Sequence, residues 1–171
     1  MIYVTVGTHY LGFERLIKKM DEIAGKIDEE VIAQIGSTKY KPKNMKYFKF
    51  IKEEEKILEL YKKARIVLSH SGVGTILTVL NYGKPLVIVP RLKKFNEHID
   101  DHQIELAEML KNEEGVQVVY DTDKLEHSLN NAKPRKFKKS IKNKNLVNFL
   151  KNYIMVIENE NMHGDINTIS S

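Results

Sequence analysis

Short runs of apolar residues alternate along the chain with longer segments in which apolar residues recur every three or four positions. The short runs end at glycine, proline or serine, as buried strands do, and the longer segments have the periodicity of amphipathic helices. The runs predict strands at residues 1–6, 31–35, 47–50, 65–69, 86–89 and 116–120. The periodic segments predict helices at residues 13–25, 53–64, 74–82, 99–111 and 124–130.

Because strands alternate with helices, the pattern predicts an α/β fold with a Rossmann-like, doubly wound parallel sheet. The strand runs are apolar throughout, which is typical of strands that helices cover on both faces. We place this α/β domain at residues 1–132. It is followed by a basic linker at 133–144, an apolar helix at 145–158 and a polar, disordered tail at 159–171.

Composition excludes several classes of protein. The 171 residues include no cysteine, so disulfides, cysteine-ligated zinc and thiol catalysis are ruled out. The apolar stretches are far shorter than the roughly 18 residues that span a bilayer, and the first residues read as a strand rather than a signal peptide. We therefore expect a cytoplasmic protein.

Positive charge is concentrated in the predicted linker. Residues 133–144 carry seven lysine or arginine residues and no acid, and without these seven charges the net charge of +5 would be −2. We expect no nucleic-acid binding, because the chain lacks the repeated aromatic interleaving of single-strand binders. The linker suits an anionic membrane surface or an acidic partner, and a simple solvated connection is the alternative.

Three unusual stretches, residues 7–9, 69–75 and 90–103, follow predicted strands. The carboxyl ends of parallel strands meet at one edge of a sheet, where ligands bind. In the stretch 69–75, two glycines stand at a strand-to-helix turn. Glycine permits positive φ and close backbone approach, and a helix start attracts anions, so this turn could hold a diphosphate without a metal. The stretch lacks the lysine of a Walker loop and the third glycine of a dinucleotide site, so a tight structural turn is the alternative.

Two other groups could hold a metal ion. His98 and His102 are four residues apart and could share a metal if a third ligand joined them. Asp121 and Asp123 form the D-x-D pattern with which some glycosyltransferases hold Mn²⁺. A solvated N-terminal turn is the alternative for the histidines, and helix capping explains the two aspartates more simply, so we expect no metal. A hydrolase has no support, because neither a Ser-His-Asp set nor a Gly-x-Ser-x-Gly elbow is present.

Several motifs occur together in one order over about residues 1–120. They are Val4-Thr5-Val6-Gly7-Thr8, Ala33-Gln34-Ile35-Gly36, Ser69-His70-Ser71-Gly72-Val73-Gly74-Thr75, Gly83-Lys84-Pro85, and Val89-Pro90-Arg91 through Glu97-His98 to Asp101-His102-Gln103. This ordered set resembles the C-terminal domain of family 28 glycosyltransferases. It is most similar to the stand-alone, donor-binding subunits of two-part UDP-sugar transferases. Of these, the bacterial polysaccharide branch is most alike, and the catalytic subunit of the dolichol-pathway UDP-N-acetylglucosamine transferase is also similar.

The resemblance implies the C-terminal half of a GT-B enzyme. Its activity would be an inverting, metal-independent transfer of a hexose or N-acetylhexosamine from a UDP-sugar to a polyprenyl-diphosphate-linked acceptor. No cofactor is implied, since the UDP-sugar is the donor substrate. A membrane-anchored partner subunit would supply the acceptor lobe and recruit the chain to the cytoplasmic membrane face. The predicted helix at 145–158 would pack on its own domain or dock on that partner. A non-catalytic nucleotide-sugar-binding regulatory module is one alternative, and an unrelated Rossmann-type nucleotide-binding domain is another.

The resemblance also assigns site residues. The donor-binding positions are Gly7, Thr8, His70, Ser71, Gly72, Val73, Gly74, Thr75, Glu97, His98, His102 and Gln103. Among these, residues 71–75 would cap the diphosphate and Gln103 would contact the donor sugar.

Two roles stay open. Many relatives bind the ribose with a glutamate where this chain has Thr78, so Glu97 replaces it, the ribose is held otherwise, or donor affinity is reduced. The general base is not identified. His9 is the candidate in this chain, and a solvated loop histidine is the alternative.

Overall fold

The computed structural model describes residues 1–134 together with positions 148 and 152. Residues 1–134 all belong to one compact unit. The predicted basic linker beyond residue 134, the predicted apolar helix at 145–158 and the predicted tail therefore lie outside the described residues, apart from those two positions. No helix in the described part of the chain is long and apolar enough to cross a membrane.

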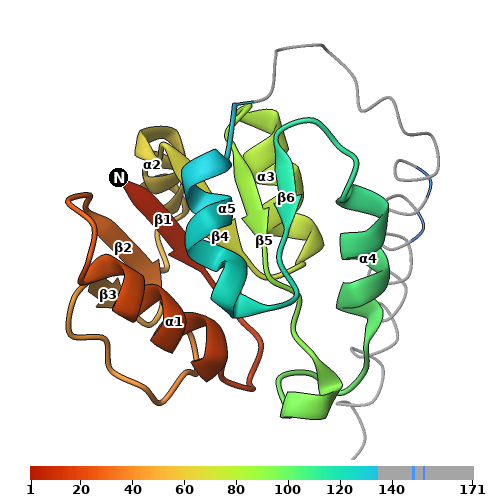
Figure 1. The fold of residues 1–171 in the computed structure, drawn as a ribbon, viewed down its shortest axis with the longest axis horizontal. Helices are drawn as coiled ribbons and strands as arrows, with labels where there is room; N and C mark the ends of the chain where they lie inside the picture. The colour runs from red at the N-terminus through yellow and green to blue at the C-terminus, as the bar shows by residue number, and fades with distance from the viewer. Residues whose placement is uncertain (135–147, 149–151, 153–171) are drawn as a thin grey trace, which may run out of the picture. The chain divides into compact units, whose positions relative to one another are not determined.

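The described chain forms a six-stranded sheet in the order β3-β2-β1-β4-β5-β6, and every neighbouring pair of strands is parallel (Figure 1). The strands are β1 (Ile2–Thr5), β2 (Val31–Gln34), β3 (Lys46–Phe48), β4 (Ile66–Ser69), β5 (Leu86–Ile88) and β6 (Val116–Val118). Thr5 of β1 lies opposite Ser69 of β4, which lies opposite Ile88 of β5. The three strands therefore end at the same level, and the predicted doubly wound, Rossmann-like sheet is confirmed.

Helices cover both faces of the sheet (Figure 1). The helices are α1 (Glu14–Ala24), α2 (Glu54–Lys63), α3 (Val73–Asn81), α4 (His102–Leu110) and α5 (Leu125–Asn131). Apolar residues of α1 and α5 join one core cluster with alternate residues of the strands. On the opposite face, the buried ring of Tyr3 in β1 meets the ring of Tyr61 in α2 edge-on, with centroids 5.1 Å apart. Burial on both faces explains why the strands read as uninterrupted apolar runs, each large side chain contributing about 2 kcal/mol.

The largest departure from the predicted elements lies between β5 and α4. The predicted helix at 99–111 begins only at His102, and a 3-10 turn, η1 (Lys93–Phe95), precedes it. Asn96 then takes a left-handed conformation with φ of 55°, which turns the chain back toward the sheet. Periodicity alone did not reveal this excursion, because tertiary hydrogen bonds described below hold it in place.

Candidate functional site

Three connections meet at the carboxyl edge of the sheet. The β1–α1 loop (residues 6–13), the β4–α3 turn (residues 70–72) and the β5–α4 segment (residues 89–101) follow three neighbouring strands. The chain runs from β1 toward β2 on one side and later resumes at β4 on the other, so the sheet order reverses here. Such a switch point is where open α/β sheets bind ligands.

The β4–α3 turn presents unpaired polar groups. Helix α3 begins after Gly72 with no side chain capping its start, so the first backbone N–H groups have no partner within the helix. Beside them, the Ser71 side chain is buried, with 3% of the residue exposed, and its Oγ has no hydrogen-bond partner among the described residues. A buried hydroxyl without a partner is unfavourable unless a ligand or water completes it.

The glycines of this edge act differently from the sequence expectation. Gly72 has a φ of −97°, and the positive-φ glycines of the described chain include Gly7, at +71°, but not Gly72 or Gly74. A Cβ at Gly72 would lie 2.2 Å from Nε2 of His70, and one at Gly7 would lie 2.5 Å from Cε1 of the same ring. Both glycines therefore make room for the His70 imidazole. Gly74 is exposed and a Cβ there would meet nothing within 4 Å, so it alone faces open space.

His70 forms an uncharged floor beneath the turn. Burial, assisted by the nearby Arg91 cation, lowers the pKa of His70 to about 3. The imidazole is therefore neutral near pH 7 and offers a bound anion no full positive charge.

Arg91 joins the β5–α4 segment to the β1–α1 loop. Arg91 is fully buried. Its terminal N–H groups donate to the carbonyl oxygens of Val6, Leu11, Gly12 and Glu97 at 2.9 to 3.0 Å. Burial lowers the pKa of Arg91 to about 10, so the side chain is still a cation near pH 7. One side chain thus fixes the path of two loops at the site.

Glu97 is held by a second arginine. Arg15 of α1 donates from Nε and Nη2 to the two carboxylate oxygens at 2.9 and 2.8 Å, and the Leu92 N–H donates to Oε2 at 3.0 Å. Glu97 is only 4% exposed. Ribose binding by Glu97 would require breaking this buried pair. Thr78 stands where many relatives have the ribose-binding glutamate. Its hydroxyl already donates a hydrogen bond to the Gly74 carbonyl one helical turn earlier, at 2.9 Å.

Gln103 ties the turn to the β5–α4 segment. Its Oε1 accepts hydrogen bonds from the Ser71 N–H at 3.3 Å and from the Arg91 N–H at 3.0 Å. The structure thus places Gln103 beside the predicted diphosphate turn, where its amide oxygen already accepts two hydrogen bonds from the protein. Thr8 of the β1–α1 loop is exposed at the same edge.

His9, His98 and His102 form a chain of ring contacts. The His9 ring stacks on Tyr10 and on His98, with centroids 4.6 Å apart in each case. The Asp100 carboxylate bridges Nδ1 of His98 and Nδ1 of His102, both at 2.9 Å, and its hydrogen bond raises the pKa of His102. Burial, with the His98 and Arg91 charges, lowers the pKa of His9.

The two groups that could have held a metal ion have other partners in the structure. Among the described residues, no three side chains of the ligating types are close enough together to hold an ion. Asp121 caps the 3-10 turn η2 (Thr122–Lys124) by accepting from the Asp123 N–H at 3.0 Å, and Asp123 pairs with Lys19 at 2.5 Å. The capping role predicted for this stretch is confirmed.

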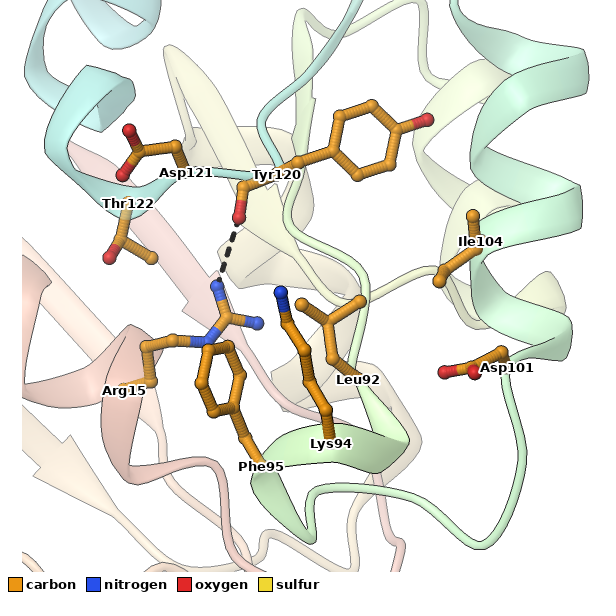
Figure 2. Close-up of a pocket in the computed structure, with 9 residues that line it drawn as sticks. All are labelled: Arg15, Leu92, Lys94, Phe95, Asp101, Ile104, Tyr120, Asp121 and Thr122. Atoms are coloured by element: carbon orange, nitrogen blue, oxygen red, sulfur yellow. Dashed lines mark hydrogen bonds between the residues drawn. The ribbon is translucent and has the colours of Figure 1, made fainter.

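A pocket of about 530 Å³ opens on the β6 side of the edge, between α1, η1, α4 and η2 (Figure 2). Its lining residues are Arg15, Leu92, Lys94, Phe95, Asp101, Ile104, Tyr120, Asp121 and Thr122. None of the predicted donor-binding residues lines it. Sequence reasoning missed this pocket. It also missed that Arg91 and Arg15 cross-link the loops of the site, because one sequence does not show which groups an arginine contacts.

Comparisons with known proteins found matches to most of this chain. The family model described as the glycosyltransferase family 28 C-terminal domain matches residues 1–157, beyond the stretch that carries the motifs. The UDP-N-acetylglucosamine transferase subunit ALG13 of Homo sapiens is 33% identical over 122 residues, which are 66% of this chain and 10% of that protein. The chain thus spans about a tenth of that relative.

Two solved structures share the fold. The glycotransferase of kitacinnamycin superposes with a TM-score of 0.58 at 18% identity, over 75% of this chain and 33% of that one. The calicheamicin glycosyltransferase CalG4 gives 0.53 at 14% identity, over 77% of this chain and 34% of that one. The likeness shows that the Rossmann-like domain is of the kind found in GT-B glycosyltransferases.

Proposed function

This chain belongs to the glycosyltransferase family 28 C-terminal domain family, and from that premise we propose that it binds the donor of a UDP-sugar-dependent glycosyltransferase. The transferred group is a hexose or an N-acetylhexosamine, and the acceptor is a sugar linked to a polyprenyl diphosphate. A membrane-anchored partner subunit supplies the acceptor lobe and brings this chain to the cytoplasmic membrane face. The name of the human relative, a transferase subunit, supports the two-part arrangement.

One observation carries the proposal. The buried Ser71 Oγ has no hydrogen-bond partner in the described chain, and it lies at the uncapped start of α3 on the switch point of the sheet. A helix start offers N–H donors and partial positive charge, and the hydroxyl adds one more donor, so together they suit a diphosphate. At Gly74, the second residue of α3, a Cβ would meet nothing within 4 Å, so the chain leaves this helix start open.

The same donors explain how the transfer is promoted. As the bond from the sugar to the diphosphate breaks, negative charge grows on the departing UDP. Donors that already point at the phosphate oxygens stabilise this charge without reorganisation, and a metal ion is then not required. The acceptor hydroxyl attacks the opposite face of the anomeric carbon, so the configuration inverts.

The general base comes from the partner subunit. In the described conformation, Nδ1 of His9 accepts a hydrogen bond from the Leu11 N–H at 3.2 Å. In a neutral imidazole the proton then resides on Nε2, which donates rather than accepts. His9 therefore has no free basic nitrogen to take a proton from the acceptor.

The ribose is held by groups other than the usual glutamate. Thr78 bonds to its own helix, and Glu97 is engaged by Arg15 and by the Leu92 N–H. We expect the nucleotide to depend more on its diphosphate contacts than in relatives that keep the glutamate.

A variant at Gly74 tests the diphosphate site. Valine at this position adds a branched side chain to the first turn of α3, beside the N–H groups proposed to bind the diphosphate, so Gly74→Val is expected to remove UDP binding in calorimetry while the protein stays folded. Asn81→Val, at the exposed far end of the same helix, is the matched control, since it adds the same β-branched residue without approaching the site. Unchanged UDP affinity in a folded Gly74→Val protein would overturn the assignment.

Two further measurements separate the finer parts of the proposal. UDP binding should survive EDTA, and a strict Mn²⁺ or Mg²⁺ requirement would contradict the metal-independent mechanism. Transfer from a UDP-sugar to a lipid-linked acceptor should appear only when the partner subunit is co-expressed. UDP-sugar binding without transfer under those conditions would favour the non-catalytic regulatory module, which also fits a site that lacks its own base.

A further inference from the structure

Two arginines cross-link the loops around the candidate donor site, and only one of them is bonded to a carboxylate. Arg15 donates to the carbonyl oxygens of Pro90 and Tyr120, and its charge is matched by the Glu97 carboxylate at 2.8 Å. Arg91 donates to backbone carbonyls alone, and within the described residues it makes no ion pair.

The environment of Arg91 is unusual for a cation. The guanidinium is fully buried over the ring of Phe13, with its central carbon 4.7 Å from the ring centroid, and its Nε has no partner among the described residues. Glu97 and Glu14 act on it only through space, and both Glu97 oxygens are already bound. A buried charge without a bonded counterion is unfavourable, so an anion bound nearby would stabilise the protein.

Arg91 is also next to the groups that would hold that anion. Its Nη2 donates to the Val6 carbonyl, directly before the left-handed Gly7, and its backbone N–H shares Gln103 Oε1 with the Ser71 N–H. The cation therefore lies beneath the β1–α1 loop and beside the β4–α3 turn. Its field reaches the diphosphate site through protein rather than through water, where it is screened less.

We propose that Arg91 is a positioning residue whose charge, which has no bonded counterion, selects the diphosphate of the donor and whose hydrogen bonds hold the β1–α1 loop against it. The proposal deepens the proposed function and rests on it. Arg91 does not touch the ligand. It acts through the loop carbonyls that it binds and through its electric field, so binding of UDP depends on its charge whereas binding of uridine does not.

The test compares UDP with uridine, which lacks the phosphates. In Arg91→Met the charge is lost while an apolar chain of similar length remains. We expect calorimetric competition to show UDP affinity falling about tenfold more than uridine affinity. Lys84→Met is the matched control, because Lys84 also donates to backbone carbonyls, those of Lys62 and Ala64, but precedes β5 at the opposite end of that strand from Arg91. This control should leave the ratio of UDP to uridine affinity unchanged.

A charge-preserving variant keeps the test decisive if Arg91→Met does not fold. Arg91→Lys retains the charge but cannot reach four carbonyls at once, and a buried lysine loses its proton at a lower pH than an arginine. In this variant the ratio of UDP affinity to uridine affinity should approach that of the unaltered protein at about pH 7.5 and fall toward pH 9. The unaltered protein should keep its ratio over this range, because Arg91 stays charged and His9 and His70, with lowered pKa values, stay neutral.

The outcomes are distinct. If the affinities for UDP and uridine fall in parallel in both Arg91 variants, Arg91 is only a scaffold and the inference is overturned. If the unaltered protein binds neither compound, the proposed function itself fails. If it binds UDP through the α3 turn but its ratio is insensitive to Arg91, the proposed function stands without this inference.

Discussion

The β4–α3 turn and the β5–α4 segment are neighbours at the carboxyl edge of the sheet, yet they treat their polar groups in opposite ways. In the β5–α4 segment, the polar side chains are almost fully bonded within the protein: Glu97 binds Arg15, Asp100 bridges two histidines and Arg91 binds four carbonyls. In the turn, Ser71 Oγ is buried without a partner and the start of α3 is uncapped.

This contrast separates scaffold from binding surface. A bonded network holds its residues in place and has little left to offer a ligand, whereas buried donors without partners gain most when a ligand arrives. We therefore regard the β5–α4 segment as the support and the turn as the contact surface. Substitutions in the support should act first on folding, and substitution of Ser71 in the turn should act first on affinity.

The largest expected effect belongs to the support. Glu97→Gln removes the charge that neutralises the half-buried Arg15, and because Glu97 itself is buried, its loss from the pair costs about 3 kcal/mol of unfolding free energy. Urea unfolding followed by circular dichroism measures it. Glu30→Gln, in the exposed pair with Lys46, should leave stability unchanged.

The same Glu97→Gln protein tests the ribose alternative. If the carboxylate serves Arg15 and not the ribose, UDP affinity measured well below the unfolding temperature should hardly change. A large loss of affinity with little loss of stability would reverse the contrast and return Glu97 to the binding surface.

The sheet was predictable from the sequence for a specific reason. Strands buried on both faces leave uninterrupted apolar runs, and the run that ends at Ser69 is followed by the glycine-rich start of α3. The excursion between β5 and α4 was not predictable, because η1 and the left-handed Asn96 lie between Arg91 and Glu97, whose hydrogen bonds reach Val6 and Arg15 far away in sequence. Local pattern contains no information about such partners.

The site was predictable only in part for the same reason. The Gly-rich turn and Gln103 stand out as motifs, and the structure brings them together at one hydrogen bond. The reason for Gly72 was missed, because it is set by the His70 ring and not by its own φ. Arg91 and Arg15 carry no signature in one sequence that would reveal their burial.

A pair of glycines sharpens the contrast within the turn itself. Gly72→Ala places a Cβ 2.2 Å from the His70 ring, so it should lower the unfolding free energy by about 2.5 kcal/mol through overpacking. Gly74→Ala meets nothing within 4 Å and should raise stability by about 0.5 kcal/mol, as alanine is the better helix former. Thermal unfolding of both variants gives the signs. Equal destabilisation by the two changes would show that the turn, like the support, is closely packed throughout.

The buried His70 beneath the turn should make the free energy of unfolding depend on pH. Folded His70 stays neutral down to about pH 3, whereas an unfolded histidine takes up a proton below about pH 6.5, so acidification favours unfolding. This contribution is fully present above that unfolded pKa and is lost as the pH falls. Between about pH 7 and pH 5 the loss attributable to His70 is about 2 kcal/mol. His70→Gln should show a correspondingly flatter pH dependence of the unfolding free energy in urea. The same pH dependence in His70→Gln and the unaltered protein would mean that His70 takes up its proton in the folded turn as readily as in the unfolded chain.

The smallest effect on stability should come from the residue that matters most for contact. Ser71→Ala removes a buried hydroxyl that has no partner in the described chain, so the unfolding free energy should stay within about 0.5 kcal/mol of its original value or rise slightly. UDP affinity should nevertheless fall by about five- to tenfold, because one donor to the diphosphate is lost.

Thr78→Val is the matched control on the next turn of α3, since its hydroxyl is already bonded to the Gly74 carbonyl and should contribute little to binding. Calorimetry for UDP and thermal unfolding, performed on both variants, measure the two quantities separately. A Ser71→Ala protein that loses stability but keeps its affinity would assign Ser71 to the support, and the division between the turn and the β5–α4 segment would then be wrong.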